Sequence, residues 1–164
     1  MPVRIAPMVH EGKVYFGSDD GAAYCVDAET GEQVWRYDVT PGERMVMNNG
    51  RAIAFHPVRT GVVVRDGIAY FGASLLPWKE SYLVGVNAQT GKAEGAGTFR
   101  HRLDGLTLEG VMLATDNELI LPQGRVAPMR FNRSTGAQAG SLGGGGGVVV
   151  VITEDQHILR QGQA

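Results

Sequence analysis

Cysteine is nearly absent from this 164-residue chain, and long apolar runs are missing altogether. Cys25 is the single cysteine, which excludes an internal disulfide and any metal site built from several thiolates. Its neighbours Tyr24 and Val26 are β-forming residues, so we interpret Cys25 as a small buried apolar side chain. No run approaches the roughly 20 apolar residues that a transmembrane helix needs, so no membrane span is predicted. The opening stretch MPVRIAPMVHEG does not have the pattern of a secretory signal peptide.

An excess of one charge is also lacking. The 15 basic and 17 acidic residues leave a net charge of −2, which argues against nucleic acid as a partner, because nucleic-acid binding demands a basic face. Metal-ligand spacing is missing too, since no two of the four histidines are related as i, i+4, and we predict no metal site. The Gly-x-Ser-x-Gly motif of serine hydrolases does not occur. The histidines are His10, His56, His101 and His157.

Glycine, by contrast, is abundant. The 24 glycines are about twice the usual share of roughly 7%. They separate short runs rich in Val, Ile, Tyr and Phe, and no ten-residue segment has helical spacing. The sequence therefore predicts an all-β protein. The runs include KVYFGS, AAYCVDA, QVWRYDV, GVVVRDG, IAYFGAS, YLVGVNA, ELILPQG, PMRFNRS and VVVVITED.

One short turn occurs three times, as VDAETG, VNAQTG and FNRSTG. In each copy an Asp or Asn side chain can accept hydrogen bonds from backbone N–H groups two or three residues further on. The final glycine can adopt a positive φ, as a hairpin with a bulge requires. We interpret the three copies as structural hairpin corners. Their Asx, Thr and Gly positions are Asp27, Thr30 and Gly31; Asn87, Thr90 and Gly91; and Asn132, Thr135 and Gly136.

Around each corner the same four strands recur, and the Asx positions repeat after 60 and then 45 residues. Four strands per unit of roughly 40 to 50 residues are typical of a β-propeller blade. The predicted fold is therefore a partial β-propeller of four-stranded antiparallel blades, treated as one incomplete domain over 1–164. The blades are expected at 5–39, 61–99 and 108–142, with a partial blade at 147–164. Two insertions, 43–60 and 75–80, account for the longer first interval.

About three and a half blades cannot close a ring comfortably, because propellers normally have roughly four to eight. The open ends would leave sheet faces and unpaired edges, which invite association. We therefore expect the chain to be a fragment of a larger propeller, or to complete its ring with another copy of the chain.

The segment Gly12–Val39 resembles a nearly complete repeat of the quinoprotein-like β-propeller family, named for binding pyrroloquinoline quinone (PQQ). It has a strand, a Gly-Ser-Asp-Asp-Gly turn, a second strand, Asp-x-x-Thr-Gly and then Trp35. The longer arrangement looks like the large repeat proteins of environmental bacteria such as planctomycetes. In this family the tryptophan docks one blade on the next. Trp35 lies four residues after the corner glycine Gly31, and the residues four positions after Gly91 and Gly136 are Gly95 and Gly140. We therefore predict looser fourth strands in the second and third units.

The resemblance implies two functions. The quinone-dependent dehydrogenases of the family use adjacent cysteines beside the cofactor, and this sequence has none. The family also contains propellers without a cofactor, such as the lipoprotein scaffold of outer-membrane barrel assembly. We therefore expect a non-catalytic binding or scaffold module with no evident cofactor. The alternative is part of a PQQ-dependent dehydrogenase, with PQQ and Ca²⁺ as its cofactors, whose missing blades hold the remaining ligands. Both readings imply a periplasmic or exported parent protein.

Three short motifs have both a binding and a structural interpretation. The glycine run 143–147 lacks the Lys-Ser/Thr ending of a phosphate loop, and we favour a connection between blades. The pair Asp19-Asp20 could offer oxygens to a cation, but Asp-Gly between two strands is a hairpin signal. The sequence Asn132-Arg133-Ser134 fits a glycosylation acceptor, yet it is also the third corner, and the corner explanation suffices.

The first insertion is the strongest candidate for a functional surface, because loops on a rigid scaffold often carry function. It contains Arg44 and several further polar side chains. Guanidinium groups gathered at the mouth of a propeller would suit a carboxylate, a phosphate or an acidic sugar. In the other interpretation, these arginines pair with acidic residues of neighbouring strands and hold the blades together. The candidate ligand-binding residues are Arg51, His56, Arg59, Trp78, Arg125 and Arg130.

Overall fold

The computed structural model describes residues 2–42, 44–143, 150–152 and 158–160, and all regular elements in these residues are β-strands. The glycines 144–147 and most of the expected partial blade at 147–164 lie outside the described residues. Twelve of the strands form three four-stranded antiparallel sheets. Each four-stranded sheet follows chain order from one edge to the other, as a propeller blade does.

Sheet 1 contains β1 (Met8–His10), β2 (Lys13–Gly17), β3 (Ala22–Asp27) and β4 (Gln33–Asp38). Sheet 2 contains β7 (Val58–Arg65), β8 (Ile68–Ala73), β9 (Ser81–Asn87) and β10 (Phe99–Leu103). Sheet 3 contains β11 (Leu113–Ala114), β12 (Glu118–Leu121), β13 (Met129–Asn132) and β14 (Gln138–Ser141).

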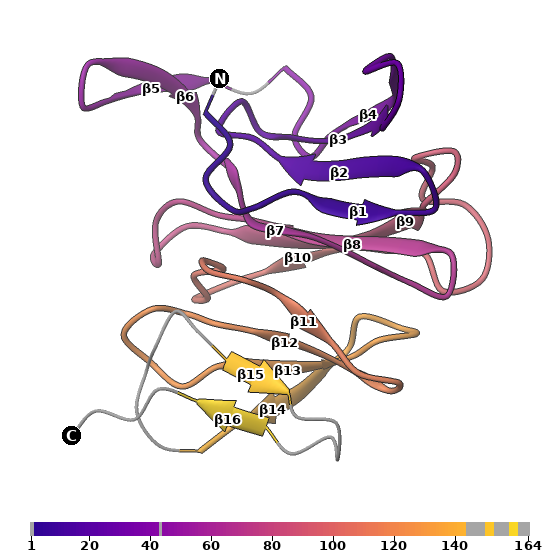
Figure 1. Ribbon diagram of the computed structural model, residues 1–164. Helices are drawn as coiled ribbons and strands as arrows, with labels where there is room; N and C mark the ends of the chain where they lie inside the picture. The colour runs from indigo at the N-terminus through magenta and orange to yellow at the C-terminus, as the bar shows by residue number, and fades with distance from the viewer. Residues whose placement is uncertain (1, 43, 144–149, 153–157, 161–164) are drawn as a thin grey trace.

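Two hairpins complete the described strands. β5 (Met45–Asn48) and β6 (Arg51–Ala54) pair with each other inside the segment expected to be an insertion, and β7 also begins in it. The turn is Asn49-Gly50, with φ of 50° and 76°, as the Asn-Gly hairpin signal requires. In Figure 1 this hairpin extends away from the stack of sheets. The second hairpin pairs β15 (Val150–Ile152) with β16 (Ile158–Arg160).

The three sheets follow one another face to face, with sheet 2 in the middle (Figure 1). Period-2 alternation places one set of side chains on each face of a strand. One buried cluster joins sheets 1 and 2 through residues such as Tyr15, Trp35 and Phe71. A second cluster joins sheets 2 and 3 through residues such as Leu83 and Phe131. Sheet 2 is therefore buried on both faces, which explains the near-continuous apolar runs of β8 and β9.

The three Asx corners share the same set of hydrogen bonds from backbone N–H groups. At the first, Oδ1 of Asp27 accepts from the backbone N–H of Glu29 at 3.0 Å and of Thr30 at 2.8 Å. The N–H of Gly31 donates to the carbonyl of Asp27 at 3.0 Å, and Gly31 has φ of 73°. Asn87 and Asn132 accept the matching pairs at 3.0 Å each, and the corner glycines that follow have φ of 68° and 69°.

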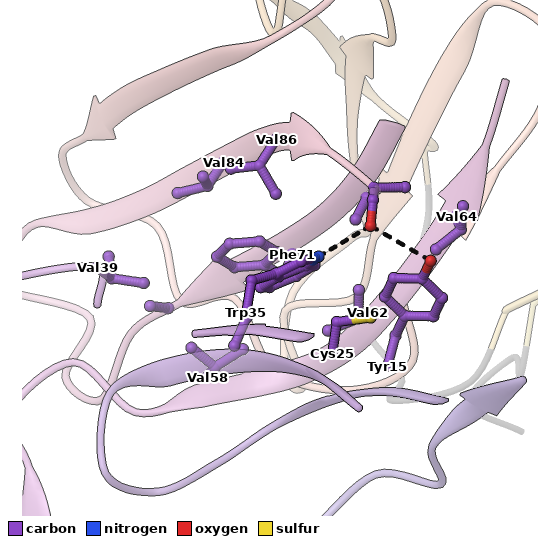
Figure 2. Close-up of a cluster of buried hydrophobic side chains, with 14 residues drawn as sticks. Tyr15, Cys25, Trp35, Val39, Val58, Val62, Val64, Phe71, Val84 and Val86 are labelled. Atoms are coloured by element: carbon purple, nitrogen blue, oxygen red, sulfur yellow. Dashed lines mark hydrogen bonds between the residues drawn. The ribbon is translucent and has the colours of Figure 1, made fainter. Parts of the chain in front are cut away.

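An aromatic side chain from one sheet docks on the corner of the next. Trp35 lies across Gly91, where an added Cβ would come within 2.6 Å of the indole ring. The indole N–H of Trp35 donates to the carbonyl of Ala88 at 2.8 Å, and the hydroxyl of Tyr15 donates to the same oxygen at 3.3 Å. Figure 2 shows both bonds converging on that oxygen. Burial raises the pKa of Tyr15 to about 12, so its hydroxyl stays protonated as a donor.

In sheet 2, the residue equivalent to Trp35 is found from strand pairing, and not from its distance in sequence to the corner glycine. Trp35 pairs with Cys25, two residues before Asp27. Phe99 pairs with Gly85, two residues before Asn87. The prediction that Gly95 takes the place of the tryptophan is therefore wrong.

The reason is a longer connection. The segment after Gly91 delays the fourth strand, so that Phe99 rather than Gly95 reaches the docking position. Its ring lies over Gly136 at the third corner, where an added Cβ would come within 2.6 Å of the ring. In sheet 3, Gly140 does occupy the equivalent position, opposite Arg130, and all of β14 is exposed.

Candidate functional site

The two insertions lie next to each other and enclose a cavity of about 410 Å³. One wall is the β5–β6 hairpin, and the other is the loop between β8 and β9. We call this cavity the insertion groove. Apolar side chains form most of its lining, with one cation contributed from each wall. The lining residues are Arg44, Met45, Val46, Phe55 and Lys79.

Buried contacts fix the floor of the insertion groove. His56 is only 2% exposed, and its Nε2 lies 2.9 Å from the carbonyl of Glu80 in the opposite wall. The imidazole packs edge-on against Phe55 and Tyr82, with ring centroids 5.2 and 5.1 Å apart. The N–H of Phe55 also donates to the carbonyl of Arg44 at 3.3 Å. The predicted ligand residue His56 is therefore a buried connector between the walls.

Asp19 anchors the hairpin to sheet 1. Its side chain is fully buried and accepts from Arg4 at 2.7 Å and from Arg59 at 2.9 Å. Its backbone carbonyl accepts from the N–H of Ala54 at 2.8 Å, next to the groove. Burial alone would raise the pKa of Asp19, but the hydrogen bonds and charges of the two arginines outweigh burial and hold this pKa below its usual range. The carboxylate therefore stays ionised near neutral pH.

The four candidate arginines divide into two groups. Arg59 pairs with Asp19 across sheets 1 and 2, and Arg130 pairs with Glu118 within sheet 3. These two agree with the interpretation of arginines as internal ties. Arg51 lies exposed on β6, and Arg125 lies exposed in the loop between β12 and β13. In the part of the chain that the structure describes, neither has a carboxylate within ion-pair distance.

Trp78 is 73% exposed on the loop between β8 and β9, next to Lys79. A second cavity of about 340 Å³ also lies against this loop. Its lining includes Leu75, Pro77 and Arg125. The loop therefore contributes to two cavities, and the second is lined by polar residues such as Glu109 as well as by apolar ones. Sequence reasoning found the two insertions and Trp78, but it did not identify Met45, Val46, Phe55 or Lys79, because only the folded chain brings the two walls together.

Two methionine side chains of the hairpin are exposed. Met45 is 46% exposed and Met47 is 72% exposed, both on β5. The described residues provide no ion-pair partner for Arg44 or Lys79 either. Flexible methionines beside exposed cations are suited to contact a partner that carries apolar and acidic groups.

Within 2–42, 44–143, 150–152 and 158–160, no three His, Cys, Asp or Glu side chains gather as a possible metal site. Cys25 is buried between β2 and β4, and burial raises the pKa of its thiol. A buried thiol with a raised pKa is a poor nucleophile. The described residues also include no helix long and apolar enough to cross a membrane.

A family model of the PQQ-repeat type, described as outer membrane protein assembly factor BamB, matches residues 1–102. The chain belongs to this family. The match covers more than half of the chain and includes the first two corners. It confirms the resemblance that Gly12–Val39 and its corner turn predicted. No curated protein sequence matches the chain.

Solved structures share the fold. Quinohemoprotein alcohol dehydrogenase from Comamonas testosteroni aligns with a TM-score of 0.58 at 20% identity, over 84% of this chain and 20% of its own. BamB from Moraxella catarrhalis aligns with a TM-score of 0.55 at 20% identity, over 84% of this chain and 39% of its own. Europium-containing methanol dehydrogenase aligns with a TM-score of 0.54 at 17% identity, over 84% and 24%.

These likenesses confirm the predicted all-β partial propeller, and at such identities they show the fold alone. The chain spans between 20% and 39% of the length of these three structures. Both predicted functions, the scaffold and the dehydrogenase, have a structural relative, so the fold does not choose between them.

Proposed function

We propose that this chain is a non-catalytic binding module, and that the insertion groove holds an extended segment of a protein partner with alternating apolar and acidic side chains. The observation that supports this is the composition of the groove. Met45, Val46 and Phe55 offer apolar surface, while Arg44 and Lys79 supply positive charge at the rim. An extended strand projects alternate side chains to opposite sides, so it can fill the groove and reach the cations at once.

The hairpin is also suited to this role through its backbone. β5 pairs only with β6 among the described strands, so its other edge is open for β-augmentation. The exposed Met45 and Met47 lie on this strand. Main-chain hydrogen bonds to β5 would give affinity, and the groove would give selectivity for the side chains.

A fluorescein-labelled nonapeptide of alternating leucine and aspartate is a direct probe. We expect fluorescence anisotropy to show saturable binding to the full chain, weakened at least fivefold by Lys79→Glu or Arg44→Glu, because charge reversal repels the acidic side chains. Lys92→Glu is the matched control, since Lys92 is exposed just past the corner at the opposite end of β9. Equal affinity of the Lys79 and Lys92 variants would contradict the proposal.

The alternative function is tested by a second titration. Part of a PQQ-dependent dehydrogenase would take up PQQ with Ca²⁺ and reduce a dye with an alcohol substrate. Among the described residues, no three carboxylate side chains gather that could hold Ca²⁺ through their oxygens. We therefore expect no quinone uptake by absorbance, and stoichiometric uptake would favour the dehydrogenase.

The family description also suggests a location. Because it names outer membrane protein assembly, we propose that the protein acts in the cell envelope after export. Fractionation of the native host, with detection by an antibody against this chain, would test this, and recovery in the cytoplasmic fraction alone would contradict it.

A further inference from the structure

Glu109 and Arg125 line the same cavity but do not pair with each other. The cavity, of about 340 Å³, is the second one to which the loop between β8 and β9 contributes. Among the described residues, neither side chain has a group of opposite charge within ion-pair distance. Two opposite charges that line one cavity without touching leave space for a ligand that binds both. We call this space the Glu109–Arg125 cavity.

Three connections form the walls of the Glu109–Arg125 cavity. They are the loop between β8 and β9, the connection from β10 to β11, and the loop between β12 and β13. All three lie at the same end of the stack of sheets, on the left in Figure 1. The walls thus come from both sheet 2 and sheet 3, which the second buried cluster holds together.

Buried contacts fix the backbone at Glu109. Leu108 is fully buried, and its N–H donates to Oγ of Ser74 at 2.7 Å. The hydroxyl of Ser74 donates in turn to the carbonyl of Leu108 at 3.0 Å. The N–H of Glu109 donates to the carbonyl of Pro122 at 3.3 Å. The exposed side chain of Glu109 is therefore attached to a backbone that is held in place.

The loop that carries Arg125 is held by hydrogen bonds of its own. Nε2 of Gln123 donates to the carbonyl of Ala127 at 2.7 Å, across the base of the loop. The N–H of Arg125 donates to the carbonyl of Gln123 at 3.1 Å. Arg125 itself is exposed, so its guanidinium is accessible to a ligand. A site with an ordered backbone loses less conformational entropy when a ligand binds.

Arg4 is a second cation near Glu109, because the charge of Glu109 contributes to the raised pKa of Arg4. The guanidinium of Arg4 binds Asp19 at 2.7 Å, however, and it does not line the Glu109–Arg125 cavity. The carboxylate of Glu109 is therefore available to a positively charged ligand group in the cavity.

The rest of the lining decides what kind of ligand fits. Leu75, Pro77 and Val126 add apolar surface, and Val126 is 57% exposed. The volume is near the lower end of the range of roughly 300–1,000 Å³ for small-molecule sites, which suits a ligand of the size of one amino acid. A guanidinium binds a carboxylate, and a carboxylate binds an ammonium group. An α-amino acid carries both of these groups and a side chain on a single carbon atom.

We propose that the Glu109–Arg125 cavity binds a free α-amino acid with an apolar side chain. Arg125 binds its carboxylate, Glu109 binds its ammonium group, and the apolar part of the lining contacts its side chain. Because both charged residues are exposed to solvent, we expect a dissociation constant in the millimolar range. This site is independent of the partner proposed for the insertion groove, since the two cavities share no lining residue.

L-Leucine is the probe, added to the ¹⁵N-labelled full chain. We expect saturable shifts in the amide signals of Glu109 and of residues 123–126. Two analogues each remove one charge, since N-acetyl-L-leucine lacks the ammonium group and L-leucinamide lacks the carboxylate. Each analogue should bind the wild type at least fivefold more weakly than L-leucine does, because one charged residue then loses its partner.

Single substitutions assign each charge of the ligand to one residue. Arg125→Gln should weaken the binding of L-leucine at least fivefold, but it should not weaken that of L-leucinamide, which has no carboxylate. Glu109→Gln should weaken L-leucine by a similar factor, but not N-acetyl-L-leucine. Both side chains are exposed, so both variants should fold. Arg51→Gln is the matched control, because Arg51 is exposed on β6 outside the cavity, and it should bind L-leucine as the wild type does.

Three results would overturn the proposal. The first is the absence of saturable shifts with L-leucine, and the second is equal binding of L-leucine by the wild type and Arg125→Gln. The third is equal affinity of the wild type for L-leucine and L-leucinamide, because the cavity would then not recognise the carboxylate.

Discussion

Asp19 shows how one buried residue joins three segments that are distant in sequence. Its carboxylate binds Arg4 and Arg59, and its carbonyl binds the N–H of Ala54 at the end of β6. The sequence indicated only a hairpin turn at Asp19-Asp20-Gly21 or a cation site. The structure shows the turn, and it also shows that guanidinium groups occupy the oxygens that a cation would need.

We expect Asp19→Asn to lower the free energy of unfolding by about 3 kcal/mol at pH 7, because Arg59 would lose its buried partner. The pKa of Asp19 is lowered on folding, so its stabilisation is present above the unfolded-state pKa of about 3.9 and is lost as pH falls through the lower folded-state value. Urea denaturation between pH 3 and 7 should therefore show that the difference in free energy of unfolding between wild type and variant becomes smaller at low pH.

Asp104→Asn is the matched control for the Asp19 variant. Asp104 pairs with Arg102 at the surface, where its side chain is 75% exposed. Exposed ion pairs contribute about 0.2–1 kcal/mol, so Asp104→Asn should lower the free energy of unfolding only slightly at every pH. If the difference in free energy of unfolding between wild type and Asp19→Asn stays constant from pH 7 to pH 3, the proposed role of the carboxylate is contradicted.

At the scale of elements, β10 and β14 are both fourth strands, but only β10 carries a docking ring. Phe99 is 8% exposed against Gly136, whereas every residue of β14 is exposed. The aromatic contact should make local opening of β10 less favourable. We therefore predict that backbone amides of β14 exchange at least tenfold faster than those of β10, measured by hydrogen exchange with mass spectrometry. Phe99→Ala should remove most of this difference, and equal protection of the two strands in wild type would contradict the argument.

Most elements of this chain could be predicted from local patterns. Asp-Gly and Asx-x-x-Thr-Gly signals locate the turns, and alternating apolar residues locate the strands between them. The β5–β6 hairpin lies in a segment that the repeat pattern predicts only as an insertion, although Asn49-Gly50 is itself a hairpin signal. The sequence does not reveal the docking role of Phe99, because the longer connection before β10 places Phe99 further from its corner glycine than Trp35 is from Gly31. Only strand pairing shows that the two residues occupy equivalent positions.

At the scale of the whole molecule, the repeat pattern predicted the propeller, but not the insertion groove. The groove depends on two loops from different parts of the chain, and His56 fixes them by reaching the carbonyl of Glu80. Nothing in the sequence around His56 specifies this contact. The sequence does not predict which arginines form ion pairs either. Arg59 pairs with the buried Asp19, whereas Arg51 is exposed, and nothing in their sequence surroundings distinguishes them.

The two buried clusters also determine how the molecule should come apart. One cluster joins sheets 1 and 2 and the other joins sheets 2 and 3. Each sheet is therefore stabilised by the sheets that lie directly next to it. Trp35→Ala removes a buried ring and its hydrogen bond to Ala88, which should cost about 3–5 kcal/mol, all of it at the first interface. Trp35→Phe keeps most of the packing and loses the hydrogen bond, so about 1 kcal/mol is expected.

Because the second cluster is untouched, sheet 1 should separate from an intact pair of sheets 2 and 3 in the Trp35→Ala variant. Hydrogen exchange in rising urea should then show residues 8–38 losing protection before residues 58–103 and 113–141. In wild type and in Trp35→Phe, sheets 1 and 2 should lose protection together. If all three sheets of Trp35→Ala open at the same urea concentration, the ring is not what couples sheet 1 to the rest of the propeller.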